Sequence, residues 1–159
     1  MSQQQMIEQP PFEMNIVRVI DLAFSVNEKI FKLNAQIEVI FTHRTSWSVE
    51  NNMLVIDLNS TIHYKDDTTK TPIISLTVQN IFSVKNLQDF IIENGEPQIP
   101  INALVTMVSL CVSHSRALMA KNCAGTIYKG ILLPLINPLE MTQSFYKNRF
   151  ENISAVIEE

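Results

Sequence analysis

The chain has 159 residues, of which 46% are hydrophobic and 18% charged, and its formal net charge is −4. This length and composition predict one globular domain with a sizeable hydrophobic core. A negative net charge without any cluster of lysine and arginine argues against nucleic acid as a partner. No basic amphipathic stretch indicates binding to a membrane surface.

The N-terminal stretch MSQQQMIEQPP lacks the basic start, apolar run and small-residue cleavage site of a secretory signal. We therefore expect a cytoplasmic protein, with a disordered segment at residues 1–11 and a single domain over residues 12–157. Cys111 and Cys123 are the only cysteines. If both lie on one helix they are about 18 Å apart along its axis, too far for a disulfide, so we expect reduced thiols.

Four stretches alternate between apolar and polar residues, as half-buried β-strands do. The first spans residues 12–26, with its apolar side chains at even positions and only Arg18 out of step. The second begins at Ala35, the third covers residues 54–64, and the fourth covers residues 74–84. Short polar connections join them, so the pattern predicts an antiparallel sheet with one buried face.

After the fourth stretch the alternation ends and helical signals begin. A short helical turn at NLQDFII is followed by the loop ENGEPQIP and by a long helix over residues 101–121. The stretch GTIYKGILLPLINP is too rich in Gly, Pro and β-branched residues for a helix, so we expect it to be extended and packed. A last helix begins at Asn137, with Pro138 at its first position and Glu140 placed to complete a capping box. Strands first and helices afterwards is the order of an α+β fold.

The helix over residues 101–121 is apolar on almost every side, which is unusual for a surface helix. Its polar residues form one narrow line: Asn102, Thr106, Ser109, Ser113 and Arg116. A membrane span needs about 20 predominantly apolar residues. This run is broken after Val112, so we expect no membrane insertion. The remaining alternatives are a central core helix and a helix that also packs against a second protein chain.

Three strings of the chain together resemble a known family. They are FEMNIVRVIDLAFSV, VQNIFSV and MVSLCVSHSRALMAKNCAGTIYKGILLPLINPLEM. In this order and spacing they resemble the first strand, the end of the last strand, and the long helix with the C-terminal region of the SecB protein-export chaperones. The resemblance covers the chain from Phe12 to about Lys147. It implies an α+β, SecB-like fold, with a four-stranded antiparallel sheet followed by a long helix and a C-terminal helix.

The resemblance also implies a homo-oligomer. SecB-like protomers pair through strands into dimers, and two dimers stack through their long helices into a homotetramer. That arrangement gives the helix at 101–121 two apolar surroundings. We therefore expect a tetramer, or a dimer, with Val105, Val108, Ser109 and Val112 at the interface. The alternative for Val108 is that it faces its own sheet.

SecB-like chaperones hold unfolded chains in apolar grooves, which the crossover loop, the end of the last strand and the following helical segment line. The matching positions here are Phe31, Phe82, Leu87 and Phe90, and the resemblance assigns them to client binding. Phe31 stands in the polar stretch NEKIFKLN, where a core role is less natural. For Phe82 and Phe90 the alternative is plain core packing.

In the family, carboxylates on the flat outer face of the sheet dock the SecA translocase motor. Asp21 matches one of these acids, whereas Ser25 and Thr77 stand at two further acidic positions. Charge complementarity chiefly sets association rate and partner choice. We therefore expect weak or absent coupling to a SecA-type motor.

No set of residues makes a case for an enzyme, and we expect no catalytic residue, no metal and no cofactor. Cys111 and His114 are three residues apart on one helical face, but the third, orienting group of a thiol catalyst is not evident. Adding Cys123 gives three candidate zinc ligands without the paired spacing of a zinc finger.

The sequence therefore predicts a SecB-like, ATP-independent holdase that binds unfolded or preprotein chains in apolar grooves, with protein export as the family's role. Two alternatives remain open. One is a dedicated partner of a single protein, such as an antitoxin. The other is an oligomeric scaffold or small-ligand module that has kept the fold and lost client binding. An exposed apolar groove near Phe31 favours the holdase, and a filled groove favours the scaffold.

Overall fold

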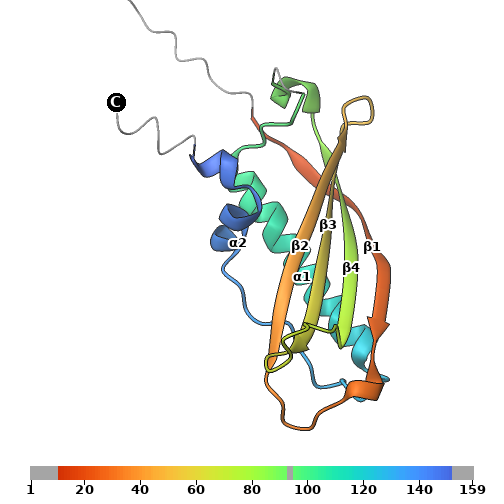
Figure 1. The fold of residues 1–159 in the computed structure, drawn as a ribbon. Helices are drawn as coiled ribbons and strands as arrows, with labels where there is room; N and C mark the ends of the chain where they lie inside the picture. The colour runs from red at the N-terminus through yellow and green to blue at the C-terminus, as the bar shows by residue number, and fades with distance from the viewer. Residues whose placement is uncertain (1–10, 93–94, 152–159) are drawn as a thin grey trace, which may run out of the picture.

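The computed structural model describes residues 11–92 and 95–151 (Figure 1). The strands are β1 (Met14–Val26), β2 (Ile37–Ser48), β3 (Met53–Tyr64) and β4 (Ile74–Val84), and they form one antiparallel sheet in the order β1-β4-β3-β2. The helices are α1 (Ile101–Cys123) and α2 (Pro138–Phe145), and two short 3-10 turns are η1 (Glu28–Ile30) and η2 (Leu87–Phe90). The predicted α+β fold, a four-stranded antiparallel sheet followed by a long helix and a C-terminal helix, is confirmed.

Two expected boundaries fall largely outside the described part of the chain. Of the predicted N-terminal segment at 1–11, only Pro11 is described. The predicted end of the domain at residue 157 also lies beyond the described residues.

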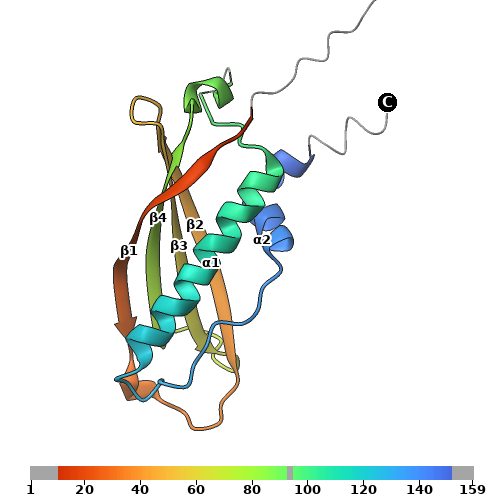
Figure 2. The same cartoon turned by 180° about the vertical axis from the view of Figure 1, so that it is seen from behind.

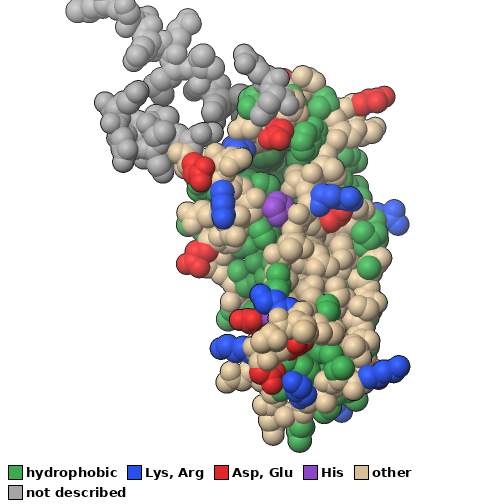
Figure 3. Space-filling view, in the orientation of Figure 1, with side chains coloured by type: hydrophobic (Ala, Val, Ile, Leu, Met, Phe, Trp, Pro, Cys, Tyr) green, Lys and Arg blue, Asp and Glu red, His purple; other side chains and the backbone are tan. Residues whose placement is uncertain are grey.

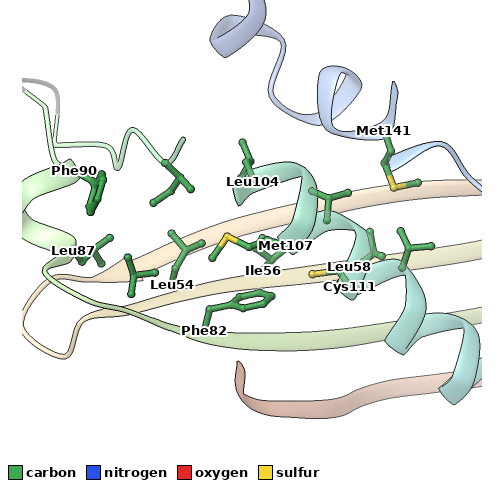
Figure 4. Packing of buried hydrophobic residues seen from close by; sticks show 14 residues of the cluster. Leu54, Ile56, Leu58, Phe82, Leu87, Phe90, Leu104, Met107, Cys111 and Met141 are labelled. Atoms are coloured by element: carbon green, nitrogen blue, oxygen red, sulfur yellow. The ribbon is translucent and has the colours of Figure 1, made fainter. Parts of the chain in front are cut away.

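α1 lies diagonally across one face of the sheet, so that side chains of both meet in a buried layer (Figure 2). On β3 and β4 the even-numbered side chains point to this face, and they are buried along both strands. The buried residues of α1 recur at helical spacing: Leu104, Met107, Val108, Cys111, Val112, Ser115, Met119 and Cys123. Figure 4 shows the side chains of β3, β4, η2 and α1 converging around Phe82 and Met107. Each large apolar side chain in this layer contributes about 1.5–3 kcal/mol to folding.

A polar pair interrupts the middle of this core. Asn80 occupies an inward position of β4 and is completely buried. Its Oδ1 lies 2.6 Å from Nδ1 of His114 on α1, and its amide donates to the carbonyls of Ile56 and Val78 at 3.4 Å. A buried amide without partners is costly, so His114 stabilises the one inward position of β4 that is not apolar. Burial lowers the pKa of His114.

β1 does not keep the strict alternation that the sequence predicts. Its register against β4 shifts between Ile16 and Arg18, and again between Asp21 and Ala23. Each shift inserts one residue and reverses which side chains face the helix. As a result the middle of β1 directs Val19 and Asp21 toward the α1 side, opposite the inward residues Asn80 and Val78. The prediction of an even-numbered apolar face is therefore wrong for the stretch between the two shifts.

The polar line of α1 forms the solvent-exposed side of the helix. Asn102, Thr106 and Ser113 are exposed, and the hydroxyls of Thr106 and Ser113 donate to carbonyls one turn back on the same helix. The opposite side provides the buried layer. The helix thus has an apolar partner within its own chain.

This orientation corrects the expected oligomer interface. Val108 and Val112 are buried in the core against their own sheet, which was the alternative stated for Val108. A buried side chain of the monomer is not available to a neighbouring chain. Val105 and Ser109 are half-buried on the flank of α1, so only these two of the four expected residues have surface to offer a partner.

By length and composition alone, α1 is apolar enough to cross a membrane, with a mean hydropathy of 1.4 over its best window and 39% of that window buried inside the structure. Core helices of folded domains pass the same test. Here the buried face of α1 packs on the sheet, which accounts for its composition without a lipid environment.

α2 is fixed against the sheet by its ends. The side chain of Asn137 accepts from the backbone N–H of Leu139, and its amide donates to the Glu140 carboxylate at 3.2 Å, so the expected N-terminal cap forms. At the other end the ring of Phe145 stacks on His43 of β2 with centroids 4.2 Å apart. The hydroxyl of Tyr146 lies 2.7 Å from that of Thr45. These contacts close α2 over the edge of the core near β2.

Candidate binding pocket

The segment that crosses from β1 to β2 carries Phe31 to the surface. Asn27 begins η1 by accepting from the N–H of Lys29, and its own N–H donates to the carbonyl of Ile73 at 2.8 Å. η1 ends at Phe31, whose side chain is 44% exposed. Its ring meets Tyr128 edge to face with centroids 5.7 Å apart. The crossover segment, drawn in orange, lies at the lower end of the molecule in Figure 1.

A pocket of about 380 Å³ opens beside this aromatic pair. It lies between the crossover segment, the start of β2, the end of β3 and the loop that follows α1. Its lining is mostly apolar or aromatic: Phe31, Lys32, Asn34, Ala35, Ile37, Tyr64, Ile73, Ile127, Tyr128, Gly130 and Ile131. A concave, mainly apolar site with a few fixed polar groups is the usual form of a ligand pocket.

Hydrogen bonds hold the walls of the pocket in place. The N–H of Lys32 donates to the Tyr64 hydroxyl at 2.7 Å, and the Tyr128 hydroxyl donates to the carbonyl of Asn27 at 2.7 Å. The N–H of Ile127 donates to the Glu28 carboxylate at 3.0 Å. These bonds join three segments that are far apart in the sequence. Burial and the neighbouring Tyr64 raise the pKa of Tyr128 to about 12, so its hydroxyl remains a donor at neutral pH.

Lysine and aspartate stand at the rim. The ammonium of Lys32 lies 3.2 Å from Asp66 and 5.1 Å from the centre of the Tyr64 ring. Both charged side chains are at least half exposed. An exposed pair of this kind contributes little to stability, so its main effect is to fix the position of the Lys32 side chain over the aromatic wall.

Further apolar side chains lie exposed along the chain that leaves the pocket. Leu33 beside Phe31 is 78% exposed, and Leu132 and Leu135 on the segment between the helices are 63% and 85% exposed. Figure 2 shows this segment running from the lower end of α1 up to α2. Contiguous exposed apolar surface marks an interaction site in a folded protein. Exposed apolar side chains therefore lie next to lining residues on two segments, with Leu33 after Lys32 and Leu132 after Ile131.

The other three residues expected to bind clients lie elsewhere. Phe82 and Leu87 have no exposed surface and form part of the hydrophobic core. Since both lie in the same buried cluster as side chains of α1, their assignment to an open groove is corrected to core packing. Phe90 is 9% exposed and stacks edge to face on Phe12, and it touches a second pocket, of about 520 Å³, near Ile92. The structure thus brings none of the three to the pocket that Phe31 lines.

Asp21 also differs from its expected place. Its carboxylate accepts from the side-chain amide of Asn122, at the end of α1, at 2.6 Å. This contact puts Asp21 on the helix side of the sheet because of the register shifts in β1. The expectation that Asp21 presents a charge on the flat outer face is therefore wrong.

Several polar side chains on the outer face of the sheet are paired with one another. Asp57 accepts from Arg44 at 3.0 Å and from Gln79 at 2.9 Å, and its side chain is almost buried. Asn59 donates to Thr77 at 2.9 Å. Since these groups already have partners, the outer face offers no uncompensated carboxylate among them to a basic partner.

The candidate thiol site has no activated nucleophile. Burial raises the pKa of Cys111 to about 12, so the thiol stays protonated, whereas a nucleophilic cysteine needs a lowered pKa. The Nδ1 of His114 is occupied by Asn80. Within the described ranges, no group of three His, Cys, Asp or Glu residues is placed to hold a metal ion, and Cys123 is buried as a free thiol.

Sequence reasoning missed most of the pocket. Tyr64 was expected only as the last inward residue of its strand, and Tyr128 only as part of a packed turn. Neither carries a local signal for a site, because the two rings come together through the sheet and the return of the chain after α1. The run ILLPLINP did contain one usable sign, since three leucines around Pro134 form neither a helical nor an alternating pattern that buries them all.

No family model and no curated protein matches the chain. Among solved structures, the Mycobacterium tuberculosis SecB-like chaperone Rv1957, in complex with a ChAD peptide from the HigA1 antitoxin Rv1956, has a TM-score of 0.50 at 9% identity and covers 79% of this chain and 87% of its own. A protein of unknown function from Streptococcus agalactiae has a TM-score of 0.43 at 10% identity, covering 79% of this chain and 100% of its own. The first likeness shows a SecB-like fold. The second is too distant to support an argument.

Proposed function

We propose that the chain is a SecB-like, ATP-independent holdase that binds apolar segments of unfolded or partner polypeptides at the pocket beside Phe31. One observation carries the proposal: this pocket is open and apolar, and exposed side chains extend its apolar surface on the neighbouring segments. Filling of the pocket by this chain was the outcome that favoured a scaffold. The described residues leave it open.

The size of the apolar surface is sufficient for useful binding. Burying one leucine-sized side chain contributes about 1.5–3 kcal/mol. Micromolar affinity corresponds to about 8 kcal/mol, and association costs at least about 4 kcal/mol more, so about four to eight such contacts are needed. Phe31, Leu33, Ile127, Leu132 and Leu135 supply apolar contacts of this kind without demanding one particular client sequence.

A homo-oligomer, tetramer or dimer, belongs to the same proposal. β1 is an edge strand, and Ile16, Val17 and Leu22 on it are each at least 43% exposed. An edge strand with exposed apolar side chains is a surface on which a second strand pairs. The cytoplasm is the proposed location, because both cysteines are free thiols.

A dedicated partner is the second candidate, in place of a role in export. The mycobacterial chaperone with the similar fold is in complex with a peptide from an antitoxin. In the present chain the outer-face acid Asp57 is already paired with Arg44. An outer-face acid that is already paired favours a chaperone that serves one partner over one that docks a translocase motor.

The test is suppression of aggregation. The purified protein is mixed with a chemically unfolded test protein without nucleotide, and light scattering is followed at increasing chaperone ratio. We expect near-stoichiometric suppression by the wild type and weaker suppression by Phe31→Ala. The matched control is Ile40→Ala, since Ile40 is 37% exposed on β2 and points to the outer face. A wild type that suppresses nothing at any ratio excludes a general holdase and leaves the dedicated partner.

A further inference from the structure

The charges around the pocket differ in sign from those of the whole chain. Lys29, Lys32, Lys65 and Lys129 all stand on the segments that line it, next to or two residues from a lining residue. The chain as a whole has a formal net charge of −4. Figure 3 shows lysine and arginine side chains together with acidic ones around the lower end of the molecule.

The nearby carboxylates offset only part of the charge of these lysines. Asp66 pairs with Lys32 at 3.2 Å, and Glu28 accepts from the backbone N–H of Ile127. Glu38, beside the lining residue Ile37, binds His63. The remaining three lysines of the rim are exposed and make no ion pair with another described residue: Lys29, Lys65 and Lys129. Four lysines against these three carboxylates leave a net charge of +1 at the rim, and three of the lysines have no acidic partner there.

The interior of the pocket has a different character from its rim. Its walls are aromatic and aliphatic, and they include the rings of Phe31, Tyr64 and Tyr128 and the side chains of Ile37 and Ile73. A buried charge in such walls is costly. A ligand that fits both parts therefore puts an apolar group into the pocket and places negative charge beside it.

We propose that the pocket selects polypeptide segments in which a bulky apolar residue is flanked by aspartate or glutamate. This rests on the proposed function and names the class of client. Exposed lysines around an apolar site raise the rate at which an acidic segment is captured, and they repel a lysine-rich segment. Because these charges are exposed, salt screens the preference and leaves the apolar contacts.

The test uses three fluorescent peptides with the same apolar centre, flanked by glutamate, by serine or by lysine. Binding is measured by fluorescence anisotropy at low and at high salt. We expect the glutamate-flanked peptide to bind most tightly and the lysine-flanked peptide least tightly, with about threefold in affinity for each lysine that is engaged. High salt should bring the three affinities together.

A double lysine variant and a control variant test whether the preference for the glutamate-flanked peptide comes from the rim of the pocket. Lys29→Gln with Lys129→Gln should reduce binding of the glutamate-flanked peptide by about tenfold and leave the serine-flanked peptide unchanged. Lys147→Gln is the matched control, because Lys147 is equally exposed but follows α2, away from the pocket. A polyglutamate peptide without an apolar residue should bind poorly.

The outcomes test the preference for acidic segments and the proposed client binding separately. Equal binding of the three peptides, or tightest binding of the lysine-flanked one, overturns the acidic preference while client binding stands. Tight binding of polyglutamate overturns it too, because the rim is then a general site for polyanions. If no peptide binds, the proposed function itself fails, and the preference fails with it.

Discussion

Truncation of two phenylalanines separates a binding residue from a core residue in one experiment. Phe82 has no exposed surface and lies in the cluster between the sheet and α1 (Figure 4). Removing a buried phenylalanine side chain costs about 3–5 kcal/mol. For a chain of this size, each kcal/mol lowers the melting temperature by about 2–4 °C, so Phe82→Ala should lower it by about 10 °C.

Phe31→Ala should behave differently. Phe31 keeps 44% of its surface exposed and packs mainly on Tyr128. Roughly half of the burial free energy of a phenylalanine is at stake, which is about 1 kcal/mol and a shift of about 3 °C.

Thermal melts and urea titrations by circular dichroism measure both variants, at one protein concentration because oligomerisation changes apparent stability. Unchanged slopes of the urea transition show that the denatured state is comparable. If Phe31→Ala melts as low as Phe82→Ala, then Phe31 supports the fold, and the assignment of the pocket as a binding surface is refuted.

Four further results are expected. Light scattering at micromolar concentration should show an oligomer, and a monomer would contradict the proposed assembly. The variant Val108→Arg should misfold rather than dissociate, because the Val108 side chain is only 1% exposed. Titration calorimetry with a SecA-type motor should show no tight, salt-sensitive binding, because the outer-face acid Asp57 is already paired. Burial lowers the pKa of His43 and His114. Below pH about 6.5 the unfolded state therefore binds more protons than the folded state, and the free energy of unfolding should fall as the pH is lowered. A urea midpoint that stays constant from neutral to mildly acidic pH would contradict this.

The alternation of apolar residues predicted the core better than the resemblance to the SecB family did. The pattern of the fourth stretch already placed Phe82 on the apolar face of its strand, and the structure buries it there. The family resemblance assigned the same residue to a groove. The local pattern reports which side of this chain is covered, whereas a resemblance transfers a surface that depends on how loops and helices lie over it. For Phe82 the covering elements are α1 and η2.

The two register shifts in β1 could not be read from the sequence. Only Arg18 departs from the alternation, and an isolated polar residue at one inward position does not distinguish a bulge from a tolerated exception. The shifts nevertheless decide the side on which Asp21 lies, and its contact with Asn122 follows from them. The prediction that even-numbered side chains of β1 face the helix is therefore correct only outside the stretch between the two register shifts.

The pocket shows why a site of this kind is difficult to predict. Phe31 was recognisable because an aromatic residue stood alone in a polar stretch, and its exposure follows from having few apolar neighbours in the sequence. The opposite walls, Tyr64 and Tyr128, come from the end of β3 and from the loop after α1. Their hydrogen bonds to the crossover segment form only when the strands have paired and α1 has packed along the sheet, because these elements bring the two tyrosines to that segment. The pocket is therefore as stable as the core that holds these elements together, and damage to α1 should remove the binding site together with the fold.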